Sequence, residues 1–455
     1  MARGVLAPPS RSNAESVHRA APGAGRLTSG AGRRGSGLLL AGLLLLYAAL
    51  AALPAAPGSV LVPATVGGSP GWLLGPLRWA GLEGARSPAA GPLFLAGMAL
   101  ALVLHVMVVR RSRSLTPAWA AAAIVAGHVL FALAPPLLSQ DAFSYLAYAR
   151  LDALYGLDPY SNAPLAAPGD PAFAFAGSKA APSVYGPVFT LLTRPLAALD
   201  VPLAFWTIKA SAALASLAVV GLVVLLARRL GRPPVRAALA LGLHPLVLVH
   251  VVGGAHNDAL VVLVVLCGVT LWAHARGVPG VAIAAAAVGL KASAGLVAPF
   301  LALRTRGPRA AAALVAGLAG TVAIGFLAFG PEALLPARLL ENQASTSSFS
   351  FPHRLAGLLG ALGPGEAAVY RGPVRLLALL ALGGVLVALA RRTWRGADPV
   401  TAAGWAILAA LAASAWLVPW YIVWLVPLAA LAGSRRLGMA AVALSAWMLP
   451  IAVPL

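Results

Sequence analysis

The sequence predicts an all-α, polytopic integral membrane protein with about 11–13 transmembrane helices and two long outer loops. Hydrophobic residues make up 60% of the 455 positions and charged residues only 10%, whereas soluble domains average about 25% charged residues. Apolar runs of roughly twenty residues recur along the chain, and each can cross a hydrocarbon core about 30 Å thick as a helix. The net charge of +21 does not indicate nucleic-acid binding, because the basic residues lie in short loops between these runs.

The N-terminal segment differs from the rest of the chain. Residues 1–36 are basic and rich in Gly, Ser and Pro, which predicts a disordered cytoplasmic tail. The apolar run from Gly37 is about twenty residues long, so it suits a retained first span better than a cleaved signal peptide. Residues 37–455 are expected to form one transmembrane domain. The single cysteine, Cys267, permits no disulfide within the chain.

The predicted spans follow in chain order from this tail. They are residues 37–57, 91–109, 117–136, 203–227, 237–252, 259–275, 310–329, 372–390, 399–417, 419–433 and 437–454. The remaining apolar segment, 279–303, is interrupted by Gly289, Lys291 and Gly295 and precedes the basic loop RTRGPR. We expect it to form two half-helices that enter and leave from one side, because a single span would reverse the orientation of every later loop.

The distribution of charge predicts the orientation. The tail and the loops RRSRS, RRLGRPPVR, HARG, RTRGPR, RRTWRG and SRR hold 22 of the 33 Lys and Arg residues, which makes these loops and the N-terminus cytoplasmic. Of the twelve acidic residues, only Glu15 and Asp398 fall on that side. The long outer loops, about 137–202 and 330–371, are therefore the expected place of function.

The outer stretch LLSQDAFSYLAYARLDALYGLDPY, residues 137–160, carries three aspartates. On a helix, one arc of about 80° collects its polar and aromatic side chains. They are Asp141, Tyr145, Tyr148, Asp152 and Tyr155. Gly and Pro in GLDPY end this helix. Tyrosines and carboxylates suit a sugar, and a partly desolvated Asp can act as a general base. Spacing alone favours the alternative, an interfacial helix with tyrosines at the headgroup level.

Several segments resemble the GT-C glycosyltransferases of actinobacteria. SQDAFSYLAYARL, YGLDPY and SVYGPVF (183–189) are most similar to the polyprenol-phosphomannose-dependent α-1,6-mannosyltransferases that build lipomannan cores of the cell envelope. GGAHNDALVVLVV (253–265) and AVGLKASAGLVAPFLAL (287–303) resemble the same group. The resemblance covers most of residues 130–305.

This resemblance implies a GT-C-like fold and an inverting transfer of mannose at the extracytoplasmic face of the cell membrane. It implies Asp141 as the general base, because the family has an acidic residue in its first outer loop. The donor would be a polyprenyl-phosphate sugar, the acceptor a lipid-linked mannoside or another glycan, and the surroundings membrane lipid. No nucleic-acid partner, cofactor or metal ion is expected, although Asp152 and Asp158 leave a divalent cation as an alternative.

Other polar residues are candidates for substrate binding. Lys291 interrupts an apolar segment, where a lysine costs about 2.5–3.5 kcal/mol and usually faces a cavity or a partner. It could bind the donor phosphate, and snorkelling to the outer boundary is the alternative. The same argument applies to Lys209, with less weight. Tyr185, within SVYGPVF, is a further candidate.

Two loops add candidates. In GGAHND, His256 could bind phosphate or a hydroxyl, and Asn257 and Asp258 could do so or cap the next helix. In ENQASTSSFSFPHR (341–354), His353 and Arg354 could close over the site, since Arg pairs with phosphate, or they could lie in a solvated loop. A final aromatic group is more typical of a membrane belt than of a sugar platform. It comprises Trp416, Trp420, Tyr421 and Trp424.

Three other functions fit parts of the sequence. A transporter or flippase of a lipid-linked substrate would share the spans and the buried lysine, but we find no repeated halves, which transporters commonly show. A non-catalytic partner of an envelope-synthesis complex would tolerate loss of Asp141. A GT-C enzyme could also use another polyprenyl-phosphate sugar, such as arabinofuranose or glucose.

Overall fold

The computed structural model describes residues 30–63, 70–81, 89–334 and 347–454, and helices are the only regular secondary structure in these ranges. Five of the described helices are long and apolar enough to cross a membrane. They are α1 (Gly30–Ala52), α3 (Ala90–Arg110), α7 (Val201–Arg229), α12 (Pro308–Phe329) and α15 (Ala367–Trp394). A sixth span forms if α8 (Pro234–Gly242) and the π-helix η8 (Val247–Gly253), which meet at a bend of 61°, are counted together. The predicted all-α, polytopic membrane class is therefore confirmed, whereas only five or six described helices have the length of the 11–13 predicted spans.

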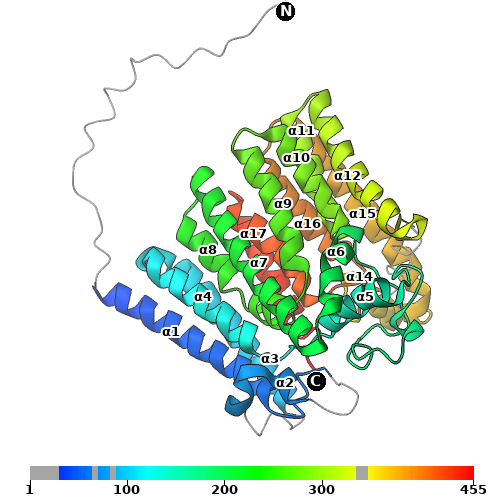
Figure 1. The fold of residues 1–455 in the computed structure, drawn as a ribbon. Helices are drawn as coiled ribbons and strands as arrows, with labels where there is room; N and C mark the ends of the chain where they lie inside the picture. Colours follow the sequence, from blue (N-terminus) through cyan, green and yellow to red (C-terminus); the bar gives the residue numbers. More distant parts are fainter. Residues whose placement is uncertain (1–29, 64–69, 82–88, 335–346, 455) are drawn as a thin grey trace, which may run out of the picture.

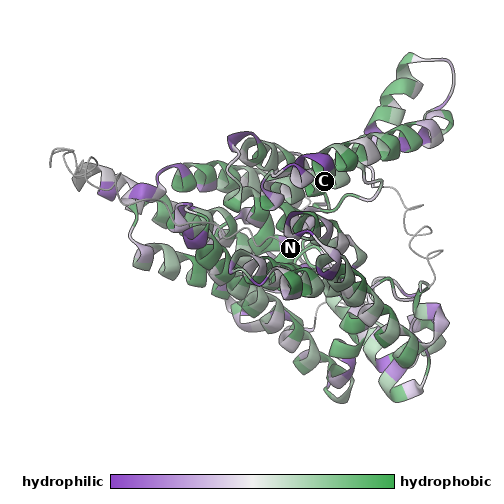
Figure 2. Cartoon of the chain, turned by 90° about the horizontal axis from the view of Figure 1, so that it is seen from above, coloured by the Kyte–Doolittle hydropathy of each residue, from purple (hydrophilic) through white to green (hydrophobic). Residues whose placement is uncertain are grey.

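Shorter apolar helices complete the bundle (Figure 1). They are α4 (Pro117–Leu133), α9 (Asp258–Ala273), α10 (Gly277–Ala286), α11 (Ala298–Thr305), α16 (Pro399–Ala413) and α17 (Ile422–Leu431). The chain ends on α18 (Arg435–Met448), and α2 (Gly71–Leu74), α5 (Asp141–Tyr155), α6 (Pro187–Thr193) and α14 (Phe351–Leu362) lie in the connections. Figure 2 shows hydrophobic residues along most of the helices, with hydrophilic residues gathered mainly towards their ends and in the loops.

Local sequence explains where several helices begin. Thr116 accepts a hydrogen bond from the backbone N–H of Trp119 at the start of α4, and Asp200 accepts one from Leu203 at the start of α7. Proline follows each cap within two residues, where its missing N–H costs no intrahelical bond. Such caps contribute about 1 kcal/mol each.

The segment predicted as two half-helices is broken at Lys291. The chain runs along α10 and the 3-10 turn Ala287–Gly289 to Lys291, whose backbone is extended, and then returns through the 3-10 turn Ala292–Leu296 and α11. A Cβ at Gly277, where α10 begins, would lie 2.8 Å from the Cγ2 of Thr305, where α11 ends. The two half-helices therefore enter and leave at the same end of the bundle, as predicted.

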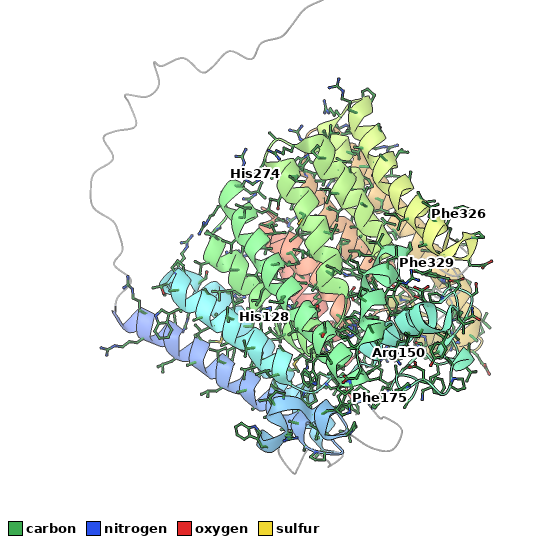
Figure 3. All side chains as sticks on the ribbon, viewed as in Figure 1. His128, Arg150, Phe175, His274, Phe326 and Phe329 are labelled. Carbon is green, nitrogen blue, oxygen red and sulfur yellow. The ribbon has the colours of Figure 1, made fainter. Side chains whose placement is uncertain are left out.

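The basic loops meet at that end. The Arg229 guanidinium donates to the Ala273 carbonyl over 3.0 Å, the Arg306 guanidinium donates to the Trp394 carbonyl, and Arg232 packs against Gly433. Figure 3 shows His274 of this end far from Arg150 of α5. The loops that the charge distribution assigned to one side do lie together.

The opposite end carries a layer of loops and short helices built around α5. Arg150 pairs with Asp170 at 2.8 Å and donates to the carbonyl of Ala197, which ties residues 164–199 to α5. Lys209, deep in α7, donates to the carbonyls of Ala134 and Pro135 where α4 ends. Lys209 is therefore a structural cap rather than a free phosphate ligand.

Candidate active site

Asp141, the first residue of α5, lies beside His256. The Nδ1 of His256 is 3.2 Å from the Oδ2 of Asp141. The Asp141 side chain is 32% exposed, whereas the His256 side chain is fully buried. The backbone N–H of Leu137 donates to the carbonyl of Gly253 and so joins the segment before α5 to the GGAHND turn.

The turn that presents His256 has little freedom. A Cβ at Gly254 would lie 2.4 Å from the His250 carbonyl oxygen, and Ala255 has a φ of 57°, a conformation that L residues rarely adopt. The backbone N–H of Asn257, the residue after His256, donates to the Tyr145 hydroxyl over 3.3 Å. Backbone geometry and α5 therefore both fix the direction of the imidazole.

A second pair of opposite charges lies next to the first. The Nζ of Lys291 is 2.9 Å and 3.1 Å from the two carboxylate oxygens of Asp258. Asp258 is fully buried, and the Lys291 side chain keeps 17% exposure. The indole N–H of Trp424 also donates to Asp258 over 2.8 Å. Lys291 thus has a buried partner, Asp258, as expected for a lysine that interrupts an apolar segment.

Asn257 stands at the N-cap position of α9 but makes no side-chain cap hydrogen bond. Its amide is 6% exposed and finds no hydrogen-bond partner among the described residues. The alternative that Asn257 caps the next helix is therefore wrong.

Aromatic rings surround both pairs. Trp420 stacks on the His256 ring with centroids 3.8 Å apart and planes at 18°. Tyr421 and Trp424 stack at 4.1 Å, and the Lys291 ammonium lies 4.8 Å and 5.4 Å from their centroids. The preferred assignment of these three residues to a membrane belt is wrong, because they pack against the charged groups.

Two tyrosines that the sequence placed on a polar stripe of α5, Tyr145 and Tyr148, are buried. Tyr145 is 1% exposed and packs edge-on against Tyr185 at 4.8 Å. Tyr148 is 3% exposed, and its hydroxyl donates to the carbonyl of Ala181 over 2.8 Å. Tyr185 is half-buried beside Asp141, so it is the tyrosine of this group best placed to meet a ligand.

The surroundings of Asp141 favour its ionised form. Burial acts to raise its pKa, but the neighbouring His256, Lys291 and Tyr185 outweigh burial and leave the pKa below the usual value. Burial, followed by the charge of Asp141, raises the pKa of Tyr185, so its phenol stays a hydrogen-bond donor at neutral pH.

Asp152 and Asp158, in and after α5, have partners of their own. Asp152 lies 3.1 Å from the Nε of Arg194. Asp158 accepts from the N–H of Tyr160 and the hydroxyl of Ser161 within its own turn. Among the described residues, no three His, Cys, Asp or Glu side chains come together as metal ligands.

His353 and Arg354 lie in the first turn of α14. The Ser350 hydroxyl accepts from the N–H of His353, and the Arg354 guanidinium lies 4.6 Å from the Phe349 ring centroid. α14 packs mainly against α15, with weaker contact to α16. No described contact brings either residue to Asp141, and residues 341–346 of the same predicted loop lie outside the described ranges.

Comparison with known proteins gives two matches to family models. Residues 37–307 match the alpha-(1->6)-mannopyranosyltransferase N-terminal domain, and residues 349–455 match the MptB C-terminal domain. No solved structure shows a significant match.

Three named relatives each match a different share of the chain. The alpha-(1->6)-mannopyranosyltransferase A of Mycobacterium tuberculosis is 29% identical over 71% of this chain and 67% of its own length. The protein of the same name from Corynebacterium glutamicum is 32% identical over 37% of this chain and 35% of its own. The alpha-(1->6)-mannopyranosyltransferase B of that organism is 32% identical over 30% of this chain and 24% of its own.

Proposed function

Because this chain belongs to the alpha-(1->6)-mannopyranosyltransferase family, we propose that it moves mannose from a polyprenyl-phosphate donor to a lipid-linked mannoside or another glycan acceptor. It is a glycosyltransferase and a polytopic membrane protein. The observation that carries the finer proposal is the partly exposed carboxylate of Asp141, which lies against a buried imidazole and close to a second, lysine-containing ion pair.

Asp141 is the general base in this proposal. The acceptor hydroxyl gives its proton to a carboxylate oxygen of Asp141, and the acceptor oxygen forms a bond to C1 of the sugar. The bond between C1 and the phosphate oxygen breaks, and its electron pair leaves with the polyprenyl phosphate. Attack from the face opposite the leaving group inverts the configuration at C1. A lowered pKa keeps Asp141 ionised and ready to accept the proton at neutral pH.

Lys291 and Tyr185 are proposed to stabilise the leaving phosphate. An ammonium group has three N–H donors, and contacts with the two oxygens of Asp258 leave at least one for a ligand. Preformed donors aimed at developing charge are usually the largest single contribution to such a catalyst. A small apolar cavity of about 20 Å³, space for about one water molecule, is lined by residues that include Ser293 and Trp424.

The proposed side of the membrane is extracytoplasmic, with a cytoplasmic N-terminus. The Asp141 group lies at the end of the bundle opposite the basic loops, where α9 and α17 begin, and the positive-inside rule makes the basic end cytoplasmic.

A donor comparison tests the proposal. Membranes containing the protein are incubated with a mannoside acceptor and one of three donors, in which polyprenyl phosphate carries mannose, arabinofuranose or glucose. The sugar of each donor is radiolabelled. We expect transfer from the mannose donor, and Asp141→Asn should lower kcat by about 10²–10⁴-fold. Asp200→Asn is the matched control, since asparagine also caps a helix.

Three outcomes would count against parts of the proposal. If transfer occurs only from the arabinofuranose or the glucose donor, mannose is not the transferred sugar. Movement of intact donor across the membrane without release of polyprenyl phosphate would instead support the flippase alternative. Near-normal turnover in Asp141→Asn would remove Asp141 from the role of base.

A further inference from the structure

The environment of His256 differs from that of a substrate ligand. Its side chain is fully buried, and Trp420 covers one ring face at 3.8 Å. Asp141, in contrast, keeps 32% of its side chain exposed. A substrate can therefore reach the carboxylate, but it meets the imidazole only through that carboxylate.

We propose that His256 is the positioning residue of the base: its Nδ1 holds the Oδ2 of Asp141, so that Oδ1 faces the acceptor hydroxyl. This inference rests on the proposed function and deepens it by giving the base a fixed orientation. It also replaces the direct contact with substrate that the sequence suggested for His256.

Three constraints hold the imidazole in place. The stacked indole of Trp420 fixes the plane of the ring. The positive φ of Ala255 and the lack of space at Gly254 fix the turn that carries it. The Tyr145 hydroxyl, which accepts from the N–H after His256, joins this turn to the helix of Asp141. A carboxylate held on one oxygen loses rotational freedom, and such preorganisation lowers the cost of reaching the reactive geometry.

The other described groups near Asp141 do not offer a cation without another partner. They are Lys291, Tyr185, Tyr145, Tyr148 and Tyr421. Of these, only Lys291 carries a positive charge, and it is already bound to Asp258. Removing the imidazole should therefore raise the pKa of Asp141, and the acidic limb of the rate profile should move to higher pH, because more carboxyl is protonated at a given pH.

Two substitutions separate positioning from packing. In His256→Asn the amide nitrogen lies near the place of Nδ1 and keeps a polar group beside Oδ2, whereas His256→Leu fills the space without one. We expect the acidic limb of kcat/KM to move up by about one pH unit or more in His256→Leu, which corresponds to about 1.4 kcal/mol, and by less in His256→Asn. His250→Asn removes a neighbouring buried histidine and should leave the acidic limb in place.

A measurement without turnover completes the test. Infrared titration of the carboxyl C=O band in purified protein follows Asp141 directly, with Asp141→Asn as the blank. The same upward shift in His256→Leu, partly reversed in His256→Asn, supports the inference. An acidic limb and an infrared titration that are both unchanged in His256→Leu would overturn it, even if the rate falls. Absence of transfer from every donor refutes the proposed function, while the infrared titration still decides whether His256 holds Asp141.

Discussion

At the residue scale, Asp141, His256, Asp258 and Lys291 could be found from the sequence because each is a polar residue inside or beside an apolar segment. Their partners could not be found, since spacing along one helix does not report what packs against it from another. Trp420 illustrates this: its spacing from Trp424 fitted a membrane belt, yet its ring lies on His256. His353 and Arg354 show the reverse, because suitable chemistry in a loop did not bring them to Asp141.

The pair of Lys291 and Asp258 leads to a prediction about stability. Removing one member of a buried ion pair leaves an uncompensated charge and costs about 3–5 kcal/mol, whereas removing both can be nearly neutral. Lys291→Met should therefore lower the free energy of unfolding by about 3 kcal/mol, and adding Asp258→Asn should restore most of it. Thermal unfolding in detergent measures both variants.

The same variants separate stability from donor binding. If Lys291 contacts the donor phosphate, the double variant regains its stability but keeps a raised KM for the donor. A double variant with wild-type KM and kcat would show that Lys291 serves only to neutralise Asp258.

At the element scale, α5 agrees with the sequence because its signals are local. The helix runs from Asp141 to Tyr155 and ends at Gly156, whose φ is 64°, as the GLDPY turn predicted. The contact between the 183–186 loop and the broken segment at Lys291 joins residues about a hundred positions apart, and no local pattern reports it. The backbone N–H of Gly186 donates to the carbonyl of Leu290 over 3.1 Å, which holds Tyr185 near Asp141.

Gly186 gives a prediction at this scale. A Cβ there would lie 2.3 Å from the carbonyl oxygen of Gly289, so Gly186→Ala must push the loop away from the Lys291 break. We expect kcat to fall by about tenfold or more, because a misplacement of about 1 Å can cost 10²-fold in rate. Gly320→Ala in α12, where a Cβ meets nothing within 4 Å, is the control. Equal rates in both variants would show that this contact does not position Tyr185.

At the scale of the whole molecule, hydrophobic runs and basic loops predicted the architecture well, because the bilayer imposes both. The predicted span 91–109 corresponds to α3 (Ala90–Arg110), and 310–329 to α12 (Pro308–Phe329). The half-helices were predictable because only a return to the same side keeps the later basic loops together. The packing that brings α17 beside α9 and η8 was not predictable, since it depends on complementary surfaces of helices far apart in the sequence.

This architecture predicts which positions meet each side of the membrane. Ser178 lies exposed in the layer of loops around α5, and Ala397 lies exposed after α15 at the basic end. Each is changed to cysteine in a Cys267→Ala background, so that the chain holds one thiol. A membrane-impermeant maleimide should label position 178 in intact cells and position 397 only after permeabilisation, because the positive-inside rule predicts that the basic end is cytoplasmic. If position 397 is labelled in intact cells and position 178 is protected, the chain has the opposite orientation and Asp141 lies on the cytoplasmic side. Mannosyl transfer would then have to draw on donor exposed at the cytoplasmic leaflet, and the role of Asp141 would need a separate test.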